Sequence, residues 1–376
     1  MGRLRMNPNL LKVPLYIAGK SVEEVQEEFG LEDVVKLASN ENPLGPSPRA
    51  IEALVRALPD AHRYSGAADR ALRRRLGPRI HPSFDERNVI TGNGATDLIR
   101  MIVQAFIFDG GEVVTGQITF PMYAICTTMF GGTLTLVPPR EDLGLDLAAM
   151  ARAITPNTRL VFISTPNNPT GMICRRREVK SFIGSLPEGV VVVFDESYRD
   201  FVSDPDYPDS TEYIAKGRDV IVLRSFSKAA GLANLRVGYA ISTPEIIHYL
   251  LHAQLPFNTG GPALVAARAS LDDGDYVARS RSLVEEQRAF MYEGLAELGV
   301  RFVPSQTNFI LLTDLPLEAT AFSELLIHQG VIVRPMNAWG LDRAVRVSLG
   351  QREDSHRFLE AMQVVLEGVR AQALAG

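Results

Sequence analysis

Short apolar runs alternate with longer amphipathic segments between about residue 88 and residue 245. Nearly unbroken apolar runs of strand length are typical of strands buried on both faces. The segments between them have the apolar spacing of helices, so the pattern predicts an α/β fold with a mainly parallel sheet between helices. The predicted strands are 112–116, 159–164, 190–194 and 219–226, and the predicted helices include 96–106 and 176–186.

The C-terminal part has a different pattern. One long helix is predicted over 275–299, ending at Gly299, and a final helix over about 353–370. Between them lie three short apolar runs at 308–313, 331–335 and 344–350. A chain of 376 residues exceeds the usual size of a single core, so we expect a large domain at 40–255. An N-terminal arm (1–39) and residues 256–376 are expected to form the smaller α+β domain.

The composition is that of an ordinary globular protein, with 46% apolar and 22% charged residues. The net charge of −5 provides no overall positive field, so we expect neither nucleic acid nor membrane as a partner. The spacing of Cys126 and Cys174 fits neither a disulfide framework nor a thiolate metal site. The first residues have no signal-peptide pattern. These features predict a cytoplasmic protein without a metal site.

Polar residues follow several of the apolar runs directly. They are "TPNNPTG" (165–171), "DESY" (195–198) and "SK" (227–228), while "VITGNGATD" (89–97) leads into a helix. Ligands of open parallel sheets bind beyond the carboxyl ends of the strands, so these groups are candidates for one site.

This set of groups suits pyridoxal phosphate. The aldehyde of that cofactor needs a lysine amine, its pyridine nitrogen needs a carboxylate, and its phosphate needs backbone N–H groups, hydroxyls and an arginine. The sequence offers a candidate for each requirement.

In these residues the chain resembles the fold-type I aminotransferases and, within them, the histidinol-phosphate aminotransferases. The resemblance covers nearly the whole chain. It extends through residues 13–30 and 36–48, "NNPTG", "DESY", "SFSKAAGLANLRVGY" and "RVSLG" (346–350).

The resemblance implies a role for each matching position around the cofactor ring. Lys228 would form the Schiff base with the cofactor and later move the substrate proton. Asp195 would pair with the pyridine nitrogen, Asn168 and Tyr198 would hydrogen-bond the phenolic oxygen, and Phe120 would stack on the ring.

The family also implies how the cofactor phosphate is held. Its partners would be Ser225, Ser227, Arg236 and the backbone N–H groups of Ala95 and Thr96. Tyr64 would reach this phosphate from a partner subunit, which implies a homodimer with shared active sites.

For the substrate, Arg346 and Arg334 match the two arginines that bind the anionic end of the amino donor, and Tyr16 matches a tyrosine that closes over it. Two guanidiniums and a phenol suit a phosphate dianion better than a carboxylate. The implied reaction is amino-group exchange between histidinol phosphate and 2-oxoglutarate/glutamate in histidine biosynthesis.

The chain departs from the family pattern at four places: Ile118, Thr96, the stretch 65–70 and Asn234. Thr96 replaces an acidic residue near the substrate, which bears on the choice of donor. Aromatic amino acids are therefore an alternative substrate class. Decarboxylation of a phosphorylated amino acid, a catalytically silent binding protein and a nicotinamide dehydrogenase are more distant alternatives.

Three further features have simple explanations. "GNGATD" has Asp97 where a dinucleotide fingerprint has its third glycine, which disfavours a nicotinamide site. His248 and His252 are four residues apart but have no evident third ligand, which favours an ordinary helix face. The arginine runs 73–75 and 175–177 are predicted to be solvated helix faces.

Overall fold

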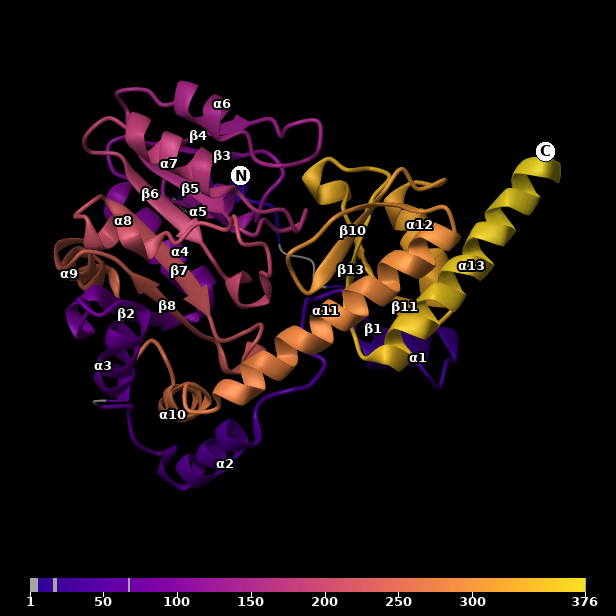
Figure 1. The fold of residues 1–376 in the computed structure, drawn as a ribbon, viewed down its shortest axis with the longest axis horizontal. Helices are drawn as coiled ribbons and strands as arrows, with labels where there is room; N and C mark the ends of the chain where they lie inside the picture. Colours follow the sequence, from indigo (N-terminus) through magenta and orange to yellow (C-terminus); the bar gives the residue numbers. More distant parts are fainter. Residues whose placement is uncertain (1–5, 16–18, 67, 376) are drawn as a thin grey trace.

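The computed structural model describes residues 6–15, 19–66 and 68–375. Its larger sheet has seven strands in the order β2-β8-β7-β6-β5-β3-β4 (Figure 1). Only β8 runs antiparallel to its neighbours, β2 and β7, so the predicted mainly parallel sheet is confirmed. The strands are β2 (Val89–Asn93), β3 (Glu112–Gly116), β4 (Thr133–Val137), β5 (Thr158–Ser164), β6 (Val191–Asp195), β7 (Val220–Ser225) and β8 (Val237–Ile241).

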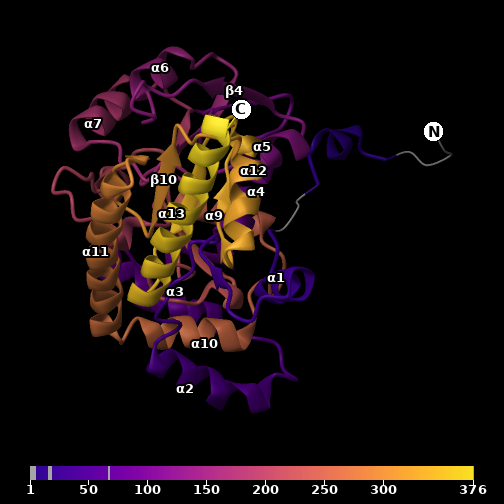
Figure 2. The same ribbon diagram turned by 90° about the vertical axis from the view of Figure 1, so that its right-hand side faces the viewer.

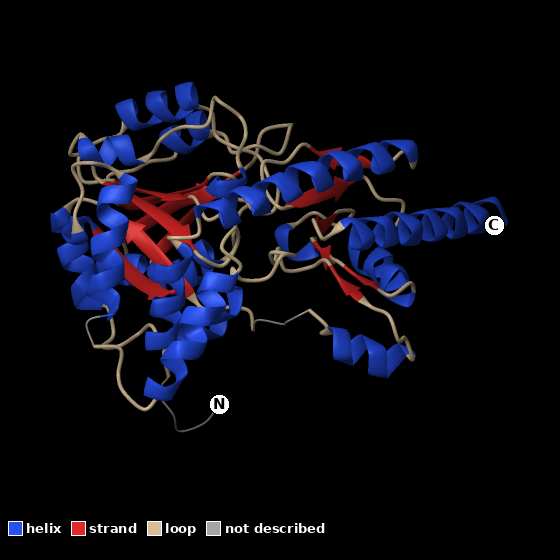
Figure 3. Cartoon of the chain, turned by 60° about the horizontal axis from the view of Figure 1, so that its bottom comes forward, coloured by secondary structure: helices blue, strands red, loops and turns tan. Residues whose placement is uncertain are grey.

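Helices cover both faces of this sheet (Figure 3). Because successive side chains of a strand point to opposite faces, Val191 and Val193 of β6 join one apolar cluster while Val192 and Phe194 join another. The first cluster is completed by α4 (Gly94–Phe106), α5 (Met122–Met129) and α9 (Pro244–Ala253). The second is completed by α6 (Leu147–Arg152), α7 (Arg176–Ser185) and α8 (Thr211–Ala215).

The apolar pattern of the sequence predicts neither β4 nor β8. β4 lies at the edge of the sheet, and Leu136 on it is 46% exposed, so this strand has no continuous buried run. β8 contains Gly238, where an added Cβ would lie 2.8 Å from the backbone nitrogen of Ala95. Only glycine fits so close to Ala95, and a glycine interrupts the apolar run by which a strand is predicted.

The smaller sheet is antiparallel, in the order β12-β13-β10-β9, and packs against three helices (Figure 2). The predicted strand 331–335 changes partners at Val333: its first half, β11, pairs with β1, and its second half, β12, pairs with β13. The elements of this part are β1 (Val35–Lys36), α11 (Gly274–Glu297), β9 (Arg301–Val303), β10 (Phe309–Thr313), α12 (Ala319–His328), β11 (Val331–Ile332), β12 (Arg334–Pro335), η6 (Asn337–Trp339), β13 (Val345–Ser348) and α13 (Arg352–Ala375). The smaller α+β unit is thus confirmed.

The domain boundary at residue 255 stays a prediction. Helix α10 (Gly261–Ser270), which follows it, packs through Leu264 and Ala267 against Leu72 and Leu76 of α3 (Ala68–Ile80). It also packs against α2 (Pro48–Ala57), as Figure 2 shows. The remaining elements are η1 (Pro8–Lys12), α1 (Val22–Phe29), η2 (Leu58–Asp60), η3 (Glu86–Asn88), η4 (Arg199–Phe201) and η5 (Ala233–Leu235).

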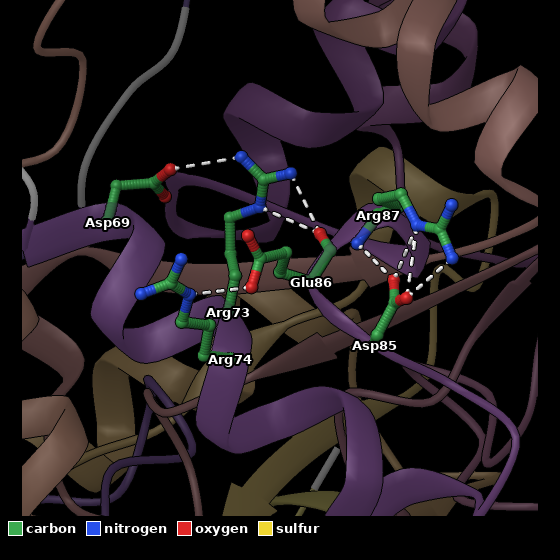
Figure 4. A network of polar contacts seen from close by, with 6 residues as sticks. All are labelled: Asp69, Arg73, Arg74, Asp85, Glu86 and Arg87. Carbon is green, nitrogen blue, oxygen red and sulfur yellow. Dashed lines mark hydrogen bonds and ion pairs between the residues drawn. The ribbon is translucent and has the colours of Figure 1, made fainter.

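The arginine run at 73–75 is only partly solvated (Figure 4). The side chain of Arg74 is 60% exposed and pairs with Glu86 at 2.7 Å, as expected for a helix face. The side chain of Arg73 is only 13% exposed, because it donates to the backbone oxygen of Glu86 and pairs with Asp69. These contacts join α3 to the turn that leads into β2, so Arg73 holds two segments together and is not a solvated residue.

Candidate active site

The predicted cofactor residues other than Tyr64 lie at the carboxyl-terminal edge of the larger sheet or beside it. Asp195 is the last residue of β6 and Ser225 the last residue of β7, and the segment 165–171 directly follows β5. These strands are parallel neighbours, so their ends lie side by side. Ala95 and Thr96 lie in the first turn of α4, next to β8. The topology therefore brings together residues that are far apart in the sequence.

Lys228 lies between the two sheets. Its Nζ donates to the backbone oxygens of Ser39 and Asn40, both at 3.2 Å, and lies 5.6 Å from the centre of the Tyr198 ring. Tyr198 is buried, and its hydroxyl accepts a hydrogen bond from Nδ2 of Asn40 at 3.0 Å. Asn40 also bonds to Ser348 of β13, so it links the lysine, the tyrosine and the smaller sheet. The amine has no carboxylate partner among the residues that the structure describes.

Asp195 is only 5% exposed. Burial raises the pKa of its carboxyl above the ordinary value, while hydrogen bonds from Ser197 and Tyr123 act in the opposite direction. Ser197 donates from its hydroxyl at 2.6 Å and from its backbone nitrogen at 3.0 Å, and Tyr123 donates at 2.8 Å. Within the described ranges no cation pairs with this carboxylate. A buried carboxylate without a cation fits the protonated nitrogen of a pyridine ring.

Tyr123 is a site residue that the sequence analysis missed. It is fully buried, stacks on Phe162 with ring centres 4.6 Å apart, and directs its hydroxyl at Asp195. Phe120, the predicted stacking residue, is half-buried and meets Tyr123 edge to face at 5.8 Å. A possible signal in the sequence is the spacing: Tyr123 follows Phe120 by three residues, about one helical turn. The contact itself depends on the packing of α5 against β6.

The first residues of α4, together with Ser225, Ser227 and Arg236, form a candidate anion site, which we name the anion cradle. Gly94 has a φ of 77°, and an added Cβ there would collide with the guanidinium of Arg236. Arg236 donates to the backbone oxygen of Ala233 at 3.1 Å and has no carboxylate partner in the described part of the chain. The backbone nitrogen of Ser227 donates to the hydroxyl oxygen of Ser225 at 3.0 Å, which places both serines in the same turn. A helix N-terminus with an arginine beside it favours a phosphate group.

Arg334 and Arg346 are direct cross-strand partners in β12 and β13. Arg346 is buried, bonds through Nη2 to the backbone oxygen of Ala38 at 2.9 Å, and bonds through Nη1 to the side-chain oxygen of Asn168. Directly opposed like charges destabilise a sheet, and an anion bound between them would offset the repulsion. Asn168 thereby contacts Arg346, a predicted substrate residue, and its amide nitrogen is left as a donor.

The structure does not bring Tyr64 to the other site residues of its own chain. Its side chain is 81% exposed and stacks on Phe257 with ring centres 4.6 Å apart. The neighbouring Asn258 donates to Asp97 of α4 at 2.9 Å, which connects this exposed pair to the anion cradle. This position is compatible with a contact made to a second subunit. Tyr16, the other predicted substrate residue, lies outside the described residues.

The matching family model and the similar proteins agree with this geometry. Residues 32–362 match the family model "Aminotransferase class I and II". A histidinol-phosphate aminotransferase of Moorella thermoacetica is 41% identical, over 95% of this chain and 92% of that protein. A protein of Pseudomonas aeruginosa named "Histidinol-phosphate aminotransferase 2" is 39% identical, over 96% of this chain and 97% of its own.

Solved structures show the same fold. The histidinol-phosphate aminotransferase of Sinorhizobium meliloti in complex with pyridoxal-5'-phosphate superposes with a TM-score of 0.87 at 27% identity, over 98% of both chains. An aspartate aminotransferase of Thermus thermophilus gives a TM-score of 0.85 at 23% identity, over 96% of this chain and 100% of its own. With the family model spanning most of the chain, this protein belongs to the class I and II aminotransferases.

Proposed function

We propose that this chain exchanges amino groups between histidinol phosphate and 2-oxoglutarate/glutamate, with pyridoxal phosphate as cofactor, in histidine biosynthesis. The observation that carries the proposal is the pairing of Arg334 with Arg346 across β12 and β13, which offers two guanidiniums to one anionic group. Relatives at 41% and 39% identity that bear the name histidinol-phosphate aminotransferase support the same substrate.

When bound, pyridoxal phosphate supplies an electron sink for the electrons of the substrate α-carbon. The carboxylate of Asp195 would hold the ring nitrogen protonated, and Tyr123 keeps that carboxylate oriented. Asn168 and Tyr198 would donate to the phenolic oxygen, and Phe120 would pack against the ring face. The burial of Asp195 strengthens its interaction with a bound cation, because a low dielectric screens charge less than water does.

Lys228 would hold the cofactor through its amine and, once released, would be the acid and base that moves the substrate proton. Ser225, Ser227, Arg236 and the backbone N–H groups of Ala95 and Thr96 would hold the phosphate of the cofactor. At the other end of the site, Arg334 and Arg346 bind the phosphate of the amino donor, with Tyr16 closing over it.

The substrate assignment is tested with the visible spectrum of the purified, cofactor-loaded protein. Adding histidinol phosphate should bleach the cofactor band, while phenylalanine should leave it nearly unchanged, because the singly charged carboxylate of phenylalanine suits the Arg334–Arg346 pair less well than a phosphate dianion does. Bleaching by phenylalanine as fast as by histidinol phosphate would instead indicate an aromatic aminotransferase. Release of carbon dioxide from histidinol phosphate analogues with a carboxylate would indicate a decarboxylase.

We also propose a homodimer in which Tyr64 of each subunit completes the site of the other. Support comes from the 81% exposure of Tyr64 and from its stack on Phe257, itself 55% exposed, since exposed aromatic pairs mark interaction surfaces. The described part of the chain contains no helix that is long and apolar enough to cross a membrane. We propose a cytoplasmic location, supported by Cys126 and Cys174, which are both buried and unpaired.

Mixing the inactive variants Tyr64→Ala and Lys228→Ala is expected to restore activity to about a quarter of the wild-type rate, because half of the random dimers contain one intact site. The measurement is the initial rate after the mixed subunits have exchanged. Mixing Lys228→Ala with Asp195→Asn is the matched control and should restore nothing, because both residues belong to the same subunit's site. Failure of the first mixture to gain activity would contradict the shared site.

A further inference from the structure

Trp339 lies where the two sheets meet. It is the only tryptophan of the chain. It packs with Leu311 and Met336 of the smaller unit and with Leu143 and Met172 of the larger one. Its indole Nε1 donates to the backbone oxygen of Thr119 at 2.8 Å, in the loop that also contains Phe120. Trp339 is therefore fixed to the larger unit although it lies on η6 of the smaller one.

The guanidinium of Arg334 lies over the ring of Trp339, with 5.8 Å between its central carbon and the ring centre. This distance is within the range of a cation–π contact. Arg334 is half-buried, and its position on β12 directs it to the same face as Arg346. The indole thus supports the arginine that faces the proposed substrate phosphate.

The loop that anchors Trp339 is itself held rigidly. The hydroxyl of Thr119 donates to the side-chain oxygen of Asn167 at 2.7 Å, and the side-chain nitrogen of Asn167 donates to the backbone oxygen of Ile118 at 2.9 Å. Asn167 precedes Asn168, which bonds to Arg346. Both arginines are therefore connected to the same pair of loops beside the cofactor ring, Arg346 through Asn168 and Arg334 through Trp339.

We propose that Trp339 is a positioning residue that determines the preference for a phosphorylated donor. Its N–H group fixes the indole to the Thr119 loop, and the indole then fixes the guanidinium of Arg334 beside Arg346. The phosphate is bound firmly only while the two units are in this relative position. This inference rests on the proposed function, since it assigns the phosphate of the donor to the arginine pair.

The first test compares kcat/KM for histidinol phosphate with kcat/KM for histidinol, which lacks the phosphate. Trp339→Phe keeps an aromatic face but loses the N–H, and should lower the ratio of the two values about 5-fold. Trp339→Leu loses both contacts and should lower it about 30-fold. The value for histidinol should change little. A merely structural role would lower both values together and leave the ratio unchanged, which would contradict the proposal.

The second test uses the wild-type holoenzyme and needs no variant of Trp339. Titration with inorganic phosphate at constant ionic strength should change the tryptophan emission in a saturable way. The change should be lost in Arg334→Gln and retained in Arg301→Gln, because Arg301 lies on β9 at the other edge of the same sheet and its side chain is 80% exposed. An emission that does not respond, or that responds equally in Arg334→Gln, would overturn the role of Trp339.

The two tests separate this inference from the proposed function. A wild-type enzyme that is inactive with histidinol phosphate contradicts the proposed substrate, while the phosphate titration still decides whether Trp339 reports on Arg334. An active wild type with an unchanged ratio in both Trp339 variants contradicts the positioning role alone.

Discussion

Lys228→Ala is expected to lower the rate of amino-group transfer by about 10⁴-fold or more, because it removes both the covalent attachment and the proton-transfer group. Among the described residues this amine contacts two backbone oxygens, at 3.2 Å, and the ring of Tyr198, and no carboxylate there competes for it. The measurement is the steady-state rate with histidinol phosphate, together with borohydride treatment. Borohydride should fix the cofactor to the wild-type protein and not to the variant.

Lys216→Ala is the matched control for this experiment. Its side chain is 65% exposed and pairs only with Glu212, one helical turn away. Removing it should leave both the rate and the borohydride-fixed cofactor unchanged. A Lys228→Ala protein with substantial turnover, or with cofactor still fixed by borohydride, would show that another residue is the attachment point.

Asp195→Asn should lower kcat roughly 10²- to 10³-fold, because a neutral amide stabilises a protonated ring nitrogen far less than a carboxylate does. The side chain is 5% exposed, so water cannot replace the lost charge. Single-turnover kinetics with histidinol phosphate measure the effect on the chemical step directly. A variant with a wild-type rate would exclude Asp195 as the partner of the ring nitrogen.

The same variant should remain folded, and the pH dependence of its stability provides the control. The pKa of Asp195 is raised by burial in the protein without cofactor, so its contribution to stability is present below the ordinary aspartate pKa and is lost as pH rises through the folded-state pKa. At about pH 7.5 the cofactor-free variant should therefore be more stable than the wild type, and the difference should vanish near about pH 4, close to the ordinary aspartate pKa. Urea unfolding at both pH values measures it.

Much of the fold could be predicted because it depends on local patterns. The buried strands β3, β5, β6 and β7 have unbroken apolar runs, and the helices between them have regular spacing. The strand β8 could not be predicted in this way, since Gly238, which its close approach to Ala95 requires, weakens the apolar pattern. The change of partner at Val333 is likewise decided by which strands are nearby and not by the residues themselves.

The candidate site likewise contains residues that the sequence predicts and contacts that it does not. Lys228, Asp195 and Arg236 occur in motifs, so the sequence indicates them directly. Tyr123 does not, because its contact with Asp195 arises only when α5 packs against the end of β6. The contact of Arg334 with Trp339 also depends on how the two units pack. Sequence patterns report on single elements, and these contacts join two elements that the chain order does not bring together.

Asn40 connects the reactive lysine to the smaller sheet. Its backbone oxygen accepts from Lys228, its side chain bonds to Tyr198, and its backbone nitrogen bonds to Ser348 on the smaller sheet. A swing of that sheet would pull this residue with it and draw the oxygen away from the amine. A displacement of the smaller sheet and release of the Lys228 amine from Asn40 are therefore coupled.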